Sequence, residues 1–130
     1  MPQYMMLIYN PIESQLSPEE MAAQSARWGE YTQSLMDAGL FVGGDGLQGV
    51  DVATTVRVRD GQTQITDGPF AETKEFLAGY YLVESPDLDT VLAHADRIPN
   101  ITYGSLEIRP VLDQSALPSA SNGVEAGAQA

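Results

Sequence analysis

Cysteine is absent from this chain of 130 residues, which excludes disulfides, thiolate metal ligands and a cysteine nucleophile. Basic residues are also scarce. Five Arg and a single Lys stand against 18 acidic residues, for a net charge of −12. Binding to nucleic acid or to an anionic membrane surface depends on clustered positive charge, so neither partner is expected.

Long hydrophobic runs are missing as well, since no apolar stretch reaches the roughly 18 residues of a spanning helix. The first residues carry no basic stretch ahead of an apolar one, so we expect no secretory signal. These absences predict a soluble, cytoplasmic protein, and the length of 130 residues predicts one domain, residues 1–112. Residues 113–130 are mostly Ala, Ser, Gly and Gln, which predicts a disordered tail.

Hydrophobic periodicity predicts two helices between several strands. The first helix begins at a Ser17-Pro18 start with Glu20 completing a capping box, and it ends at Gly39. Gly29 inside it is expected to permit close packing on a sheet. The second helix begins at Asp87 and ends before Pro99. Expected strands span residues 4–9, 40–42, 54–59, 62–66, 77–83 and 103–112, with a Gly-rich loop after 42, a turn at 60–61 and a helical turn over 71–76.

This order predicts an α+β fold of the ferredoxin-like β-α-β-β-α-β type with an added hairpin. Both helices would cover one face of an antiparallel sheet, and the other face needs cover. We expect Tyr4, Met6, Ile8 and Val111 to make that face apolar, and a second copy of the chain to cover it.

The segment Asp67-Gly68-Pro69-Phe70-Ala71-Glu72-Thr73-Lys74-Glu75 resembles the YCII-related family, in the branch named after its DGPF motif. The blocks at 4–9, 43–47, 54–57 and 103–110 are similar to the family too. The resemblance implies a dimeric α/β barrel with a cleft, in a branch often encoded beside extracytoplasmic-function sigma factors. A His–Asp pair proposed as catalytic in other relatives is absent, because the first helix lacks His and Ile98 precedes Pro99.

The Asp67–Glu75 segment supplies the main candidate site. Asp67, Glu72 and Glu75 are candidates for acid–base catalysis, with Lys74 holding an anionic group. The alternative is structural, with Asp67 bonding within its own turn and Gly68 supplying an unusual φ. Tyr81 is a candidate for lining a pocket, and Arg109 for pairing with Glu107 or binding a carboxylate.

Two function classes follow from these residues. The first is a homodimeric small-molecule-binding or accessory module, with a sigma factor as a partner implied by the resemblance. The second is a small enzyme with acid–base chemistry from the Asp67–Glu75 segment in a dimer cleft. No metal or other cofactor is expected, because His94 stands alone and no metal-ligand spacing occurs. Carboxylates converging in a closed cleft would favour the enzyme, and carboxylates splayed into solvent would favour the module.

Overall fold

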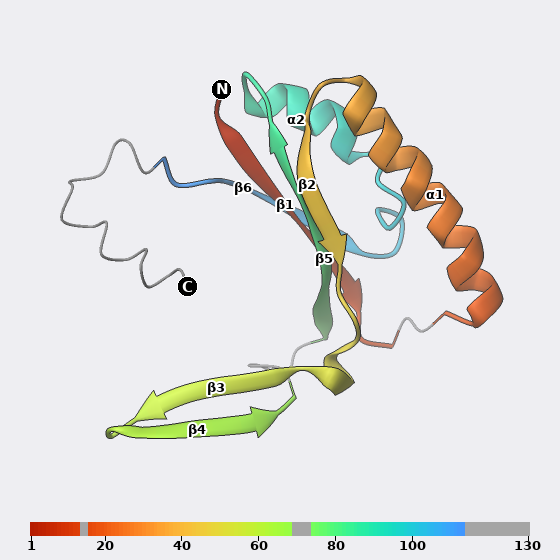
Figure 1. The fold of residues 1–130 in the computed structure, drawn as a ribbon. Coiled ribbons are helices and arrows are strands. Elements are labelled where there is room, and N and C mark those ends of the chain that lie inside the picture. Colours follow the sequence, from red (N-terminus) through yellow and green to blue (C-terminus); the bar gives the residue numbers. More distant parts are fainter. Residues whose placement is uncertain (14–15, 69–73, 114–130) are drawn as a thin grey trace.

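The computed structural model describes residues 1–13, 16–68 and 74–113 (Figure 1). The chain forms an α+β domain that begins with β1 (Gln3–Pro11), α1 (Pro18–Asp37) and β2 (Phe41–Gly46). A short 3₁₀ turn, η1 (Val50–Val52), leads into a hairpin of β3 (Thr54–Arg59) and β4 (Gln62–Asp67). The chain then returns through β5 (Glu75–Glu84), α2 (Leu88–Ala95) and β6 (Ser105–Pro110).

Four strands make the main antiparallel sheet in the order β2-β5-β1-β6. Both helices lie on one side of this sheet, while the β3–β4 hairpin stands apart from it as a separate two-stranded arm (Figure 1). The arrangement is consistent with the ferredoxin-like plan and the added hairpin. The pairing of two copies into a barrel stays a prediction.

Helix α1 begins as its sequence indicates. The Ser17 hydroxyl accepts from the Glu20 amide at 3.1 Å, and the Glu20 carboxylate accepts from the Ser17 amide at 2.8 Å. Gly39 ends the helix with a φ of +75°. The expectation for Gly29 is wrong, because a Cβ built there would meet nothing within 4 Å. This glycine is not needed for helix–sheet contact.

The core lies between the sheet and the helices. Tyr4, Met6 and Ile8 of β1 are buried there, so the expectation that they form the open face is wrong. Their partners across the core are the buried side chains Tyr31, Leu35, Tyr81, Val83, Val91 and Ile98. Because side chains alternate along a strand, the face without helices carries Met5, Leu7 and Tyr9 instead. All three are half-buried.

The arm is built as predicted around a tight turn. Asp60 and Gly61 have φ values of +53° and +74°, which suits a two-residue hairpin. Gly68 follows the arm with a φ of +115°, as its proposed turn role requires. Its amide donates to the Ala53 carbonyl at 2.7 Å, and its carbonyl accepts from the Thr55 hydroxyl at 2.7 Å. The two ends of the arm are therefore tied together.

Several element boundaries differ from the expected ones. Strand β2 continues through the glycines that the sequence assigned to a loop, because they pair with β5. Residues 75 and 76 begin β5 and are not helical. Helix α2 is shorter than expected, with Val91 buried but Leu88 and Leu92 exposed. Phe70, the other residues of 69–73 and the expected tail at 114–130 lie outside the described residues.

Candidate functional site

A cavity of about 520 Å³ lies between α1 and the β2–β5 half of the sheet. This volume falls within the range of small-molecule sites. Ser25, Trp28, Gly29 and Thr32 enter it from α1, one helical turn after another. The sheet contributes Ile8, Asn10, Phe41, Gly44, Asp45, Gly46, Ala78, Gly79, Tyr80 and Tyr81.

Aromatic rings form the inner part of this cavity, with Tyr81 at their centre. Its ring centroid lies 6.3 Å from that of Trp28 and 6.2 Å from that of Phe41. The buried ring of Tyr31 lies 5.8 Å away on the core side. Packing against three rings holds Tyr81 in place, so the aromatic wall is formed before any ligand arrives.

A pair of hydroxyl groups lies in the same wall. The Thr32 Oγ1 and Tyr81 Oη atoms are 2.6 Å apart and share a hydrogen bond. Burial raises the pKa of Tyr81, and the bond with Thr32 opposes this shift. The phenol therefore stays neutral at physiological pH. One hydroxyl hydrogen of the pair remains after the shared bond, and it can serve a ligand acceptor.

Glycines of β2 and β5 expose peptide backbone to the cavity. A Cβ at Gly44 would lie 2.6 Å from the Tyr80 carbonyl oxygen and 2.8 Å from Cδ1 of Tyr81. A Cβ at Gly79 would lie 2.8 Å from the Asp45 carbonyl oxygen. Only glycine fits at these two positions, where β2 and β5 approach closely. At Gly29 and Gly46, by contrast, an added Cβ would meet nothing within 4 Å.

The cavity wall is almost free of charge. Among the described residues that line it, Asp45 is the one carboxylate and none is Lys, Arg or His. Asp45 pairs in register with Tyr80, whose hydroxyl donates to the Asp45 carboxylate at 3.2 Å, and this bond raises the pKa of Tyr80. Both side chains point to the opposite face of the sheet from Tyr81, because neighbours along a strand alternate. The interior therefore presents hydroxyl and amide groups without a full charge.

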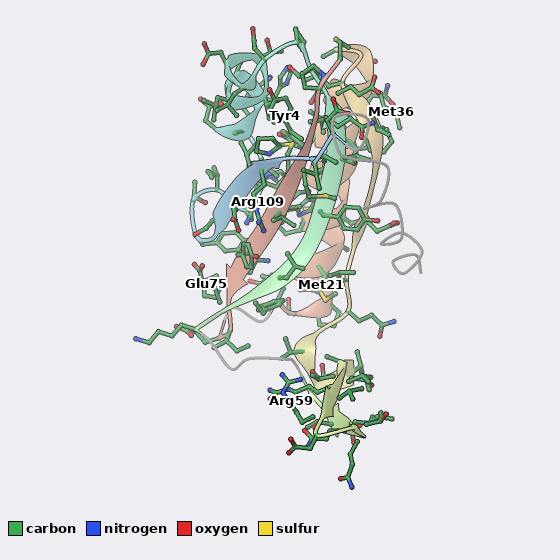
Figure 2. All side chains as sticks on the ribbon, turned by 90° about the vertical axis from the view of Figure 1, so that its left-hand side faces the viewer. Tyr4, Met21, Met36, Arg59, Glu75 and Arg109 are labelled. Carbon is green, nitrogen blue, oxygen red and sulfur yellow. The ribbon has the colours of Figure 1, made fainter. Side chains whose placement is uncertain are left out.

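The other residues predicted for a site lie away from this cavity. Lys74 and Glu75 are exposed at the start of β5, where they border a shallow hollow with Tyr9, Ser105 and Glu107. The Ser105 hydroxyl donates to Glu75 at 3.2 Å. Arg109 lies on the same open face, 3.8 Å from Glu107, and both side chains are well exposed (Figure 2). Glu75 and Arg109 therefore share a face that Tyr81 does not.

Asp67 is separated from both places, since it is exposed at the end of the arm and pairs with Thr54. Glu72 and the proposed hydrogen bonds of Asp67 within the following turn involve residues outside the described part. The described carboxylates, Asp67 and Glu75, face solvent and do not converge in a closed cleft. This is the arrangement expected of the binding module.

His94 is half-buried on α2. Its Nδ1 atom accepts from the Arg97 guanidinium at 2.8 Å. Burial and the Arg97 charge lower its pKa. Within the described ranges, no three His, Asp or Glu side chains are placed to hold a metal ion. No described helix has the length and apolar character needed to cross a membrane.

The sequence did carry a signal for the cavity. Ser25, Gly29 and Thr32 are small or polar residues on the helix face that should be apolar, and Trp28 lies among them. Trp28 is indeed packed against the core, as its size suggests, but it also lines the cavity. A helix face that lacks bulk opposite strand glycines indicates a space between the two elements.

Comparison with known proteins gives the family. The YCII-related domain matches residues 2–115 of the chain. The chain belongs to the YCII-related family. A relative from Rhizobium meliloti (strain 1021), "Uncharacterized protein R00369", is 46% identical over 61 residues, which is 45% of this chain. The chain covers about half of that relative's length, 49%. The YCII-related match covers every element of the fold and all residues of the cavity.

Proposed function

We propose that this YCII-related protein is a homodimeric small-molecule-binding module whose ligand occupies the cavity between α1 and the β2–β5 strands. The carrying observation is the cavity itself, with its aromatic wall, its hydroxyl pair and its glycine backbone. The exposed positions of Asp67 and Glu75 support a binding module over the acid–base enzyme. The phenol of Tyr81 supports it too, because its raised pKa keeps the group protonated, so no phenolate is available there as a general base.

Trp28 provides the test, because it is the one tryptophan of the chain and lines the cavity. We expect 2-naphthylmethanol, a flat alcohol, to shift the indole N–H resonance of Trp28 in a saturable way. Tyr81→Phe, which removes one hydroxyl and keeps the ring, should weaken this binding several-fold, since a hydrogen bond contributes about 1 kcal/mol. No shift at millimolar probe would contradict the proposal.

Lys74→Met and Glu75→Gln are the matched controls. Both residues border the hollow on the open face and do not line the cavity. Binding of the same probe should be unchanged in both variants. If these changes abolish binding while Tyr81→Phe does not, the ligand site lies in the Asp67–Glu75 segment and the acid–base alternative gains support.

The dimer is proposed from the open face of the sheet. Met5, Leu7 and Tyr9 form a half-buried apolar strip there, and the Glu107–Arg109 pair lies beside it on β6. A sheet with helices on one side only leaves such a strip in contact with water. A second copy of the chain carries the same strip and can cover it in a symmetric dimer. This packing supports the barrel-like dimer that the family resemblance implies.

Asp67, Gly68, Pro69 and Phe70 support placement in the DGPF branch. We further propose an accessory role beside an extracytoplasmic-function sigma factor, which membership of that branch would imply. The lack of cysteine supports a cytoplasmic location.

A further inference from the structure

Gly29 is an unexpected residue at its position. It lies in the interior of α1, where glycine costs about 1 kcal/mol relative to alanine. Neither a positive φ nor a close contact explains it, since a Cβ there would meet nothing within 4 Å. It does line the cavity, between Ser25 and Thr32 on the same helix face. Its absent side chain leaves that space open.

The chemistry of the wall defines what fits this space. Trp28, Phe41 and Tyr81 offer ring faces and edges, and Gly44 and Gly79 offer flat peptide backbone. Such surfaces make their largest contact with a flat ring system. The Thr32–Tyr81 hydroxyl pair supplies a hydrogen bond at the edge of that ring.

Neither an anionic nor a cationic ligand finds a free charged partner in the described part of the cavity wall. The described lining residues include no Lys or Arg to pair with an anion, and the chain as a whole carries −12, which repels one. For a cation, the one carboxylate among the described lining residues is Asp45, which is already bonded to Tyr80 and shares a register position with it on the face opposite Tyr81. Entering the cavity would strip either ion of water without a charged partner in return.

We propose that the cavity takes a flat, uncharged ring compound with a hydrogen-bonding group, and that Gly29 sets the size of ligand it admits. This proposal rests on the proposed function, because it names the ligand class of the same site. It assigns Gly29 a role in specificity that its place in a helix does not otherwise explain.

The ligand class is tested with three probes on one two-ring skeleton: 2-naphthylmethanol, 2-naphthylmethylamine and the carboxylate of 2-naphthylacetic acid. At pH 7 they are uncharged, cationic and anionic. The Trp28 indole resonance of the parent protein reports binding of each. We expect the alcohol to bind about tenfold more tightly than either ion. Equal or tighter binding of an ion would overturn the proposed ligand class, while the cavity would still be supported as the binding site. If no probe shifts Trp28, the proposed function fails as well.

The role of Gly29 is tested with Gly29→Leu, which places a side chain in the open space. Ala23→Leu is its control, an exposed position on α1 that does not line the cavity. We expect Gly29→Leu to weaken 2-naphthylmethanol binding about tenfold or more and Ala23→Leu to leave it unchanged, with melting curves confirming that both are folded. Retained binding in a folded Gly29→Leu protein would overturn the role of Gly29.

Discussion

Asn100 is a fully buried polar side chain with no exposed surface, as is Ser85. Its Nδ2 group donates to the Tyr9 carbonyl at 3.2 Å and to the Asn10 carboxamide at 3.0 Å. Its main-chain carbonyl accepts from the main-chain amides of Tyr103 and Gly104 at 3.1 and 2.7 Å, which closes the turn after α2. The two Nδ2 bonds fasten this turn to the end of β1, next to the cavity residue Asn10.

Gly104 is packed tightly against this amide cluster. A Cβ at that position would collide with the Tyr9 carbonyl oxygen and lie 2.7 Å from Nδ2 of Asn100. Gly104→Ala should lower the free energy of unfolding by roughly 1–3 kcal/mol, because overpacking forces the backbone to shift. Gly43→Ala is the control, since its Cβ meets nothing within 4 Å. Equal denaturation midpoints for both variants would contradict the tight packing.

His94 predicts a stability change with pH. Its pKa in the folded protein lies below the ordinary value of 6.5, because burial and Arg97 disfavour the imidazolium. The unfolded chain therefore binds the proton more readily, and stability that is present above about pH 6.5 is lost as pH falls toward the folded pKa. The urea concentration at the unfolding midpoint should be lower at pH 5.5 than at pH 7.5. This difference should be smaller in His94→Gln. An identical fall in the variant would assign the effect to other groups.

At the scale of the helix, Gly29 lowers the stability of α1, because glycine is a poor helix former. Gly29→Ala should raise the free energy of unfolding by about 0.5–1 kcal/mol, because alanine is the better helix former and its methyl group meets no neighbour. Urea denaturation of parent and variant measures this. A fall in stability would mean that the helix needs glycine for contact after all, as the sequence first suggested.

Elements with local signals were predictable from the sequence. The capping box at Ser17, the stop at Gly39 and the turn at Asp60-Gly61 each depend on residues within one turn of chain. The extension of β2 through Gly43 and Gly44 was not predictable, because glycines have low strand preference and only pairing with β5 holds them there. Long-range hydrogen bonds decided that boundary.

Which face of β1 is buried was also beyond local reasoning. Every residue from Tyr4 to Tyr9 is apolar or aromatic, so alternation alone assigns neither face to the core. Docking of α1 and α2 selects Tyr4, Met6 and Ile8. Tyr81 was proposed from its strand position and does line the cavity, whereas the roles of Trp28, Gly29 and Gly44 depend on how a helix meets two strands.

At the scale of the whole molecule, the open face predicts self-association. Light scattering at micromolar concentration should give about twice the chain mass of 14.0 kDa. Leu7→Gln should shift the protein toward monomer, because Leu7 lies in the middle of the apolar strip on β1. Leu92→Gln on α2 is the control, an exposed leucine on the helix side of the sheet. A monomeric parent protein would contradict the proposed dimer. A Leu7→Gln protein that stays dimeric would show that the dimer interface lies elsewhere.

The closed base of the arm has a consequence for how this domain tolerates change in chain length. Ala53 and Gly68 are joined by a hydrogen bond of 2.7 Å, and the main sheet has its full order of β2-β5-β1-β6 without either arm strand. Residues 54–67 thus form a detachable insertion between β2 and β5 (Figure 1). None of the arm residues pairs with a strand of the main sheet, so we expect the sheet register to survive when the hairpin is lengthened, trimmed or replaced. The arm is therefore where we expect a grafted foreign peptide to leave the cavity in its present shape.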